Sequence, residues 1–224
     1  MRQKQKKNKM VALYGAKLVE VSSERLACVP KERQKRIERC KDLESKKQML
    51  TAGLLLRKVL GIYGIDALAI EKGPNGKPMV EGIHFNLSHT DGLVICAVSD
   101  LPVGCDVEKV RQAPEGVAER FFHENERAYL ATYSDTFDEQ FFRLWTIKES
   151  YIKMTGEGMH LPMSEYEICI GEDIFVLRDG KKQNCFIKEY SIPGYQVSVC
   201  AEEELFSELA WETLSHTCDF GEKK

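Results

Sequence analysis

The chain has 224 residues, of which 43% are hydrophobic and 30% are charged, and its net charge is −3. This composition is typical of soluble globular proteins, and the length allows either one large domain or two of about 110 residues. No stretch approaches the ~20 consecutive apolar residues of a membrane-spanning helix, so we expect no membrane association of that kind.

The charge is unevenly distributed along the chain. Residues 1–58 contain 17 Lys and Arg against 6 Asp and Glu, whereas residues 59–224 contain 15 against 29. A basic segment suits a phosphate-rich ligand or an acidic protein partner. Nucleic acid is not the expected partner, because the basic stretch lacks interleaved aromatic residues. Residues 1–9 are predicted to be a basic, disordered N-terminus.

The eight cysteines are spread singly, with no C-x-x-C pair and no metal-type spacing. This pattern favours reduced thiols over zinc ligands or a disulfide framework. Lys17 and Glu20 interrupt the apolar run that follows the basic start, which argues against a signal peptide. We therefore expect a cytoplasmic protein.

In chain order, residues 11–21 are predicted to form a strand, followed by a charged helix over 30–43 and a more apolar helix over 46–60. Gly, Pro and Asn make 71–79 a turn-rich loop. Three predicted strands follow, over residues 85–92, 93–99 and 103–108.

Helices are predicted next over 114–122 and 124–133, and a long one over 139–154 that stops at Gly156. Four further strands then follow, over residues 168–170, 174–177, 185–190 and 195–201. This order predicts an α+β fold of two similar halves, each with helices packed on a mostly antiparallel sheet. The expected halves are residues 10–102 and residues 103–224, and the second is expected to carry a metal site.

Acidic side chains are predicted to meet where a strand lies beside the long helix. Asp106 and Glu108 are two residues apart on the predicted strand, and their side chains therefore point to the same face. With Glu149 from the helix they form a set of hard oxygen ligands of the kind that Mg²⁺ prefers. Lys153 lies one turn from Glu149 and is placed to neutralise phosphate charge. The alternatives are an exposed strand face and a surface ion pair.

Ser88 and His89 lie where a strand meets a turn, and they offer donors suited to phosphate. A structural histidine is the alternative interpretation. A Ser-His nucleophile pair is not expected, because neighbouring residues on a strand point to opposite faces. Spacing alone assigns no role to Glu126.

Four motifs occur in one order, preceded by Gly76-Lys77-Pro78. They are Asn86-Leu-Ser-His-Thr, Val103-Gly-Cys-Asp-Val-Glu, Arg120-Phe-Phe with Glu126, and Leu144-Trp-Thr-Ile-Lys-Glu-Ser-Tyr-Ile-Lys with Gly156-Glu-Gly. Together they make the chain, from about residue 10 to 200, resemble the surfactin-type (Sfp-like) 4′-phosphopantetheinyl transferases. Cys105 and Thr90 depart from the usual residues of this family at their positions.

The resemblance implies a pseudo-twofold monomer that holds coenzyme A between its halves. It implies transfer of the phosphopantetheine arm to a serine of an acyl or peptidyl carrier protein of a fatty-acid, polyketide or nonribosomal peptide synthase, with release of 3′,5′-ADP. By the same resemblance, Asp106, Glu108 and Glu149 hold Mg²⁺, and Lys153 contacts the phosphates.

Further site residues are carried over from the same motifs. Ser88 and His89 are expected to contact the coenzyme A phosphates, and Lys77 to lie along the coenzyme. Glu126 is expected as a ligand of a metal-bound water or as a partner of the base. Lys31 or Arg36 is expected at the 3′-phosphate.

In the implied reaction, a serine hydroxyl attacks the β-phosphate in line, and Mg²⁺ and Lys153 offset the developing charge. The proton goes to Glu149, to Glu126 or to a metal-bound water. Two other functions remain open: a Mg²⁺-dependent phosphohydrolase of nucleotide-like substrates, and a non-catalytic module that binds carrier proteins through its basic helices. The length and the second sheet argue against the shorter, trimeric class of these transferases.

Overall fold

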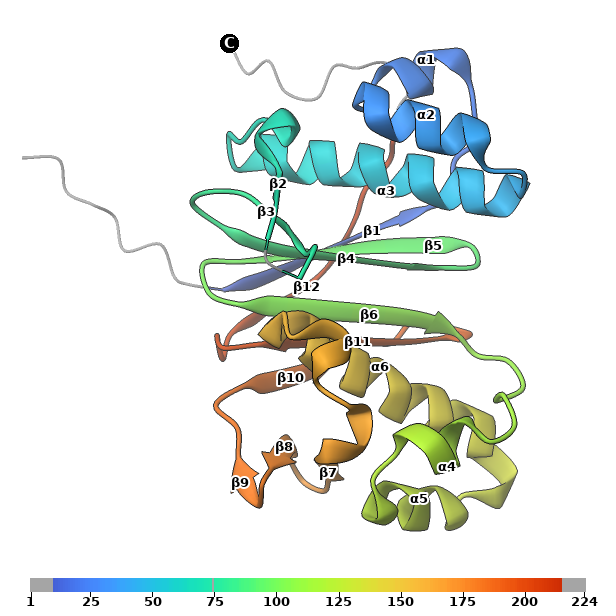
Figure 1. Ribbon diagram of the computed structural model, residues 1–224, viewed down its shortest axis with the longest axis vertical. Helices are drawn as coiled ribbons and strands as arrows, with labels where there is room; N and C mark the ends of the chain where they lie inside the picture. Colours follow the sequence, from blue (N-terminus) through green and yellow to red (C-terminus); the bar gives the residue numbers. More distant parts are fainter. Residues whose placement is uncertain (1–9, 74, 215–224) are drawn as a thin grey trace, which may run out of the picture.

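The computed structural model describes residues 10–73 and 75–214, so the expected disordered N-terminus over 1–9 lies outside the described residues. The fold has four layers, in the order helix, sheet, sheet and helix (Figure 1). Two helices, α3 (Leu43–Ile62) and α6 (Phe137–Thr155), form the outer layers and enclose the two main sheets. The predicted α+β class is confirmed.

The first sheet has the strand order β12-β1-β5-β4. Its strands are β1 (Val11–Lys17), β4 (His84–Thr90), β5 (Leu93–Ser99) and β12 (Phe206–Trp211). β5 pairs antiparallel with both β1 and β4, whereas β12 runs parallel to β1. Alternate residues of β5, including Val94 and Cys96, pack in one apolar cluster with Leu54 of α3.

The second sheet is antiparallel and has the order β10-β11-β6. Its strands are β6 (Val103–Lys109), β10 (Phe186–Glu189) and β11 (Tyr195–Ala201). α6 covers its outer face, and it ends at Gly156, which takes the left-handed conformation with φ of +73°, as the glycine at that position predicts.

The two halves follow the same path. In each, a strand leads to a helix and then to two strands, and the last strand lies between the other two. β1, α3, β4 and β5 make the first half, and β6, α6, β10 and β11 make the second. This repetition is the pseudo-twofold relation expected of the fold.

The two sheets face each other across a third apolar cluster. Val11, Leu13 and Ile95 from the first sheet meet Cys105 and Val107 from the second. Because strand residues alternate, Asp106 and Glu108 lie on the other face of β6, toward α6. The inner core therefore determines which side of β6 carries the acidic residues.

Smaller elements surround these layers. The helices are α1 (Ser23–Ala27), α2 (Lys31–Arg39), α4 (Val117–Phe121) and α5 (Glu124–Ala131). The short strands are β2 (Glu71–Lys72), β3 (Pro78–Met79), β7 (Tyr166–Ile170), β8 (Ile174–Arg178) and β9 (Lys181–Lys182). Among the described residues, no helix combines the length and the hydropathy needed to cross a membrane.

The expected boundary near residue 102 falls in the turn between β5 and β6. The division into halves at this point stays a prediction, and β12 complicates it because this strand of the second half lies in the first sheet. Among the described cysteines, Cys40, Cys96, Cys105, Cys169, Cys185 and Cys200 are free, whereas Cys28 is disulfide-bonded, contrary to the expectation of reduced thiols.

Candidate active site

The two halves meet where side chains of β4 bind the backbone of β6. Three side-chain oxygens of β4 accept hydrogen bonds from the backbone N–H groups of every second residue of β6. The Asn86 oxygen accepts from Cys105 (2.9 Å), the Ser88 oxygen from Val107 (3.4 Å) and the Thr90 oxygen from Lys109 (3.2 Å). These bonds align the two strands and bring Ser88 beside Asp106.

Four of the predicted site residues form one cluster, which we call the central cluster: Ser88, Asp106, Glu149 and Lys153. Asp106 Oδ1 accepts hydrogen bonds from Ser88 Oγ (2.7 Å) and from Lys153 Nζ (2.6 Å). Lys153 Nζ also donates to Ser88 Oγ (3.2 Å) and lies 4.0 Å from Glu149 Oε2. Helical spacing puts Glu149 and Lys153 on the face of α6 that covers β6.

The second carboxylate oxygen of Asp106, Oδ2, is buried and has no hydrogen-bond partner among the described residues. Leaving a buried carboxylate oxygen without a donor is costly. A divalent cation is a natural partner for such an oxygen, since Mg²⁺ binds carboxylates directly. The residues at this position therefore fit a metal ion.

Glu108 lies on the same face but has partners of its own. Its Oε2 accepts hydrogen bonds from Thr90 Oγ1 (3.3 Å) and Arg111 Nη1 (2.9 Å). Within the described ranges, no group of three or more His, Cys, Asp or Glu side chains is arranged so that it could hold a metal ion. The expected ligands lie on the neighbouring elements β6 and α6. The Lys153 ammonium lies between Asp106 and Glu149.

The central cluster has more negative than positive groups. Burial raises the pKa of Glu149; Lys153 opposes this shift, and the charges of Asp106 and Glu108 add to it. Burial acts to lower the pKa of Lys153, but the charge and hydrogen bond of Asp106, together with the charges of Cys105 and Glu149, leave that pKa raised. A further cation would therefore be stabilised here.

His89 is exposed at the edge of the first sheet, beside a basic face of α2. Burial and the charges of Lys153, Arg33 and Arg36 lower the pKa of His89, while Asp106 opposes them. Sequence reasoning missed Arg33, although its i,i+3 spacing to Arg36 signals a shared helix face. Lys31, a predicted coenzyme ligand, is exposed, and its charge is not among those that shift His89.

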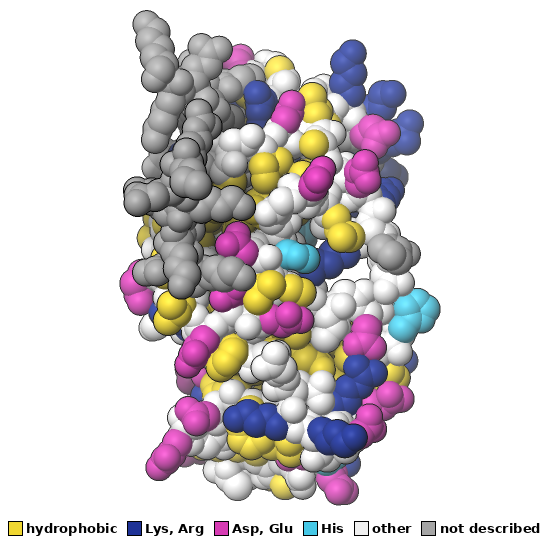
Figure 2. Space-filling model, turned by 90° about the vertical axis from the view of Figure 1, so that its left-hand side faces the viewer, with side chains coloured by type: hydrophobic (Ala, Val, Ile, Leu, Met, Phe, Trp, Pro, Cys, Tyr) yellow, Lys and Arg dark blue, Asp and Glu magenta, His cyan; other side chains and the backbone are white. Residues whose placement is uncertain are grey.

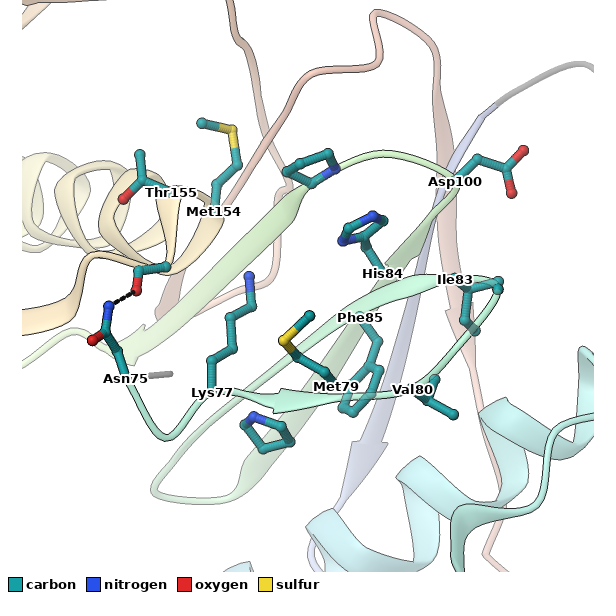
Figure 3. A pocket seen from close by; sticks show the side chains of 14 residues that line it. Asn75, Lys77, Met79, Val80, Ile83, His84, Phe85, Asp100, Met154 and Thr155 are labelled. Atoms are coloured by element: carbon teal, nitrogen blue, oxygen red, sulfur yellow. Dashed lines mark hydrogen bonds between the residues drawn. The ribbon is translucent and has the colours of Figure 1, made fainter. Parts of the chain in front are cut away.

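Lys77 approaches the central cluster from the first half. Its Nζ donates hydrogen bonds to the backbone carbonyls of Val103 (3.1 Å) and Lys153 (2.5 Å). Burial lowers the pKa of Lys77. The same side chain lines a pocket of about 580 Å³ whose wall includes Met79, Phe85, Met154 and Thr155 (Figure 3).

Glu126 does not join the central cluster. Its carboxylate is fully buried and pairs with the fully buried Lys148, with Nζ at 2.7 and 2.8 Å from its two oxygens. The same oxygens accept hydrogen bonds from the backbone N–H groups of Ile168 (2.7 Å) and His123 (2.8 Å). These contacts give Glu126 a structural ion pair, and its expected role beside the metal or the base stays a prediction.

Comparison with known proteins shows which family this chain belongs to. The chain is 39% identical over 181 residues to the 4′-phosphopantetheinyl transferase gsp of Aneurinibacillus migulanus, covering 77% of this chain and 76% of that protein. The chain belongs to the 4′-phosphopantetheinyl transferase family. The transferase matches the family model for the 4′-phosphopantetheinyl transferase superfamily over residues 102–200, which include β6 and α6.

One further relative and one solved structure are also similar to this chain. The transferase is 31% identical over 193 residues to the 4′-phosphopantetheinyl transferase Sfp of Bacillus subtilis (strain 168), covering 82% of this chain and 86% of that protein. The holo-[acyl-carrier-protein] synthase of Thermotoga maritima aligns at 23% identity with a TM-score of 0.40, over 46% of this chain and 64% of that structure.

Proposed function

We propose that this transferase moves the 4′-phosphopantetheine arm of coenzyme A to a serine of an apo acyl or peptidyl carrier protein, with Mg²⁺ as cofactor and 3′,5′-ADP as the leaving group. The observation that carries the proposal is the buried Oδ2 of Asp106 inside the central cluster, which no group in the described part of the chain hydrogen-bonds. It supports a cation site at a position where a lysine and a serine also offer donors to phosphate.

Asp106, Glu108 and Glu149 are the residues proposed to hold Mg²⁺, which supplies positive charge at the phosphates when bound. Lys153 offsets charge on the same phosphates from the side of α6, and Ser88 donates a hydrogen bond from β4. The serine oxygen of the carrier forms a bond to the β-phosphorus as the bond to 3′,5′-ADP breaks. Of the two carboxylates expected as bases, only Glu149 lies at the central cluster.

The adenosine end of coenzyme A is assigned to two surfaces, formed mainly by residues of the first half. Arg33, Arg36 and His89 together suit the 3′-phosphate, because their charges lie close enough to affect one another. The pocket that Lys77 lines adjoins the central cluster and has an apolar wall, so we place the adenine there.

A single chain supplies the whole central cluster, since Ser88 comes from the first half and the other members from the second. This supports action as a monomer. Lys and Arg side chains gather on one side of the upper part of the molecule, which holds α1 to α3 (Figure 2), and they suit an acidic carrier protein. We include a cytoplasmic location: six free thiols in the described residues agree with a reducing compartment, whereas the disulfide-bonded Cys28 is unusual there.

The test is the intact mass of a panel of apo carrier proteins after incubation with the transferase, coenzyme A and Mg²⁺. Gain of one phosphopantetheine arm, lost on addition of EDTA and in Asp106→Asn, is the expected result. The exposed Asp173 provides a matched control, and Asp173→Asn should transfer normally.

Two results would contradict the proposal. Turnover of coenzyme A without any carrier protein would indicate a phosphohydrolase. Carrier proteins that bind equally well with and without Mg²⁺, and that keep their mass, would indicate a non-catalytic binding module.

A further inference from the structure

The hairpin that joins β2 to β3 reaches from the first half of the molecule to the end of α6. Its turn is closed by backbone hydrogen bonds from Gly73 to the carbonyl of Lys77 (2.8 Å) and from Gly76 to the carbonyl of Gly73 (2.9 Å). Gly76 takes a positive φ of 77°, which a residue with a side chain rarely adopts. These features fix the backbone of Gly76 and Lys77 next to Asn75.

Both side chains bind backbone carbonyls at the C-terminal end of α6. Lys77 Nζ donates to the carbonyl of Lys153 (2.5 Å), and Asn75 Nδ2 donates to the carbonyl of Gly156 (2.8 Å; Figure 3). The last carbonyls of a helix have no partner within the helix, and they form the negative end of its dipole. An ammonium group at this point satisfies one carbonyl and stabilises the helix end.

The same ammonium also donates to the carbonyl of Val103, the first residue of β6 (3.1 Å). One side chain of the first half is thus bonded to both elements that carry the acidic and basic groups of the central cluster. The residue of α6 that it binds is Lys153, whose own ammonium binds Asp106 on β6. Any movement of the Lys153 backbone changes the reach of that ammonium.

α6 and β6 lie unusually close together at this end. A Cβ atom on Gly104 would overlap the backbone carbonyl of Ser150 and the backbone nitrogen of Met154. The backbone of α6 therefore lies directly against the backbone of β6. Because no side chain lies between them at Gly104, a small shift of the helix along the strand moves one backbone against the other. Lys77 is hydrogen-bonded to both β6 and α6 at the end of this contact.

We propose that Lys77 is a positioning residue of the transferase: its hydrogen bonds to the carbonyls of Lys153 and Val103 hold α6 in register with β6, so that Lys153 meets the phosphates of the substrate. Asn75 assists through the carbonyl of Gly156. This inference rests on the role proposed above for Lys153. It gives Lys77 a different task from a coenzyme ligand, because two of the three donors of its ammonium are used by backbone carbonyls.

The test separates positioning from substrate binding by steady-state kinetics with coenzyme A and an apo carrier protein. In Lys77→Met the side chain keeps its length but loses its donors. We expect kcat to fall ~10- to 100-fold, because a displacement of about 1 Å at the reacting groups has effects of this size. The KM for coenzyme A should change less than ~3-fold. Lys77→Arg, which keeps donors, should recover part of kcat.

A double-mutant cycle with Lys153→Met tests whether Lys77 affects kcat through Lys153. If Lys77 acts through Lys153, adding Lys77→Met to Lys153→Met should lower kcat little further. Fully multiplicative losses would overturn the inference. So would a KM for coenzyme A that rises at unchanged kcat, which is the result expected of a direct coenzyme ligand.

Lys72 on the same hairpin is exposed, and Lys72→Met should leave kcat and KM unchanged. If Lys77→Met does not fold, as judged by its thermal transition, Asn75→Ala decides: a lower kcat at constant KM supports the inference, and an unchanged kcat overturns it. Absence of transfer by the unchanged protein would refute the proposed function itself, whereas normal transfer by folded Lys77→Met refutes this inference alone.

Discussion

The buried pair of Lys148 and Glu126 allows the sharpest prediction about stability. Both side chains have no exposed surface, and Lys148 Nζ makes two hydrogen bonds to Glu126 and a third to the carbonyl of Tyr166 (2.9 Å). Lys148→Met removes all three and leaves the Glu126 carboxylate buried with only two backbone donors. Stranding one member of a buried pair costs about 3–5 kcal/mol.

This cost is large compared with the ~5–15 kcal/mol that stabilises a typical protein. Urea unfolding followed by circular dichroism measures it directly, and for an m-value of ~2–3 kcal/mol/M the midpoint should fall by ~1–2 M. The double variant Glu126→Gln with Lys148→Met removes the stranded charge. It should therefore be more stable than Lys148→Met alone, by ~1–3 kcal/mol.

A loss below about 1 kcal/mol in Lys148→Met, with an unchanged m-value, would refute this reasoning, since such a value is typical of an exposed pair. A double variant less stable than the single one would also contradict it. Either result would mean that water or another donor reaches the carboxylate of Glu126.

Three further predictions concern the site. Gly104→Ala should destabilise the protein by ~1–3 kcal/mol and lower transfer, because the new Cβ meets the backbone of α6. Gly171→Ala, whose new Cβ would make only an ordinary van der Waals contact with the backbone oxygen of Asp173 at 3.9 Å, should do neither in the same melting and transfer assays. Glu149→Gln should abolish transfer yet raise the melting temperature in EDTA at pH 8. Because the pKa of Glu149 is raised, the stabilising contribution of this side chain is present at low pH and is lost as pH rises through that pKa. The gain in melting temperature should therefore shrink on acidification, and an equal gain at all pH values would contradict this. Arg36→Ala should raise the KM for coenzyme A ~10-fold or more but not that for dephospho-coenzyme A, which lacks the 3′-phosphate; equal effects on both would remove Arg36 from the 3′-phosphate site.

Local patterns were sufficient for much of the fold. The alternation in β6 correctly predicts that Asp106 and Glu108 share one face, and Gly156 correctly predicts the end of α6. Leu93–Ser99 is predicted and observed as a strand with the same bounds. These features depend on neighbours within a few residues, which the sequence displays directly.

Other features depend on contacts between distant residues. Lys148 follows the pattern of a surface lysine, and its burial becomes clear only when α5 and β7 bring Glu126 and the carbonyl of Tyr166 to it. The motif that contains Glu126 likewise does not show that Lys148 is the partner of this carboxylate. The sequence analysis predicts no strand over Phe206–Trp211, whose pairing partner β1 lies far away in the chain.

The parallel pairing of β12 with β1 has a consequence for how the molecule folds. Val11 lies opposite Phe206, so β1 gains this neighbour only after all the residues between them have left the ribosome. Contacts between residues so distant in sequence close a long loop and slow folding. Until β12 arrives, β1 has an unpaired edge, which is a template for association with other chains. Chaperone demand and yield should therefore depend on residues 206–211 more than on the α3 layer.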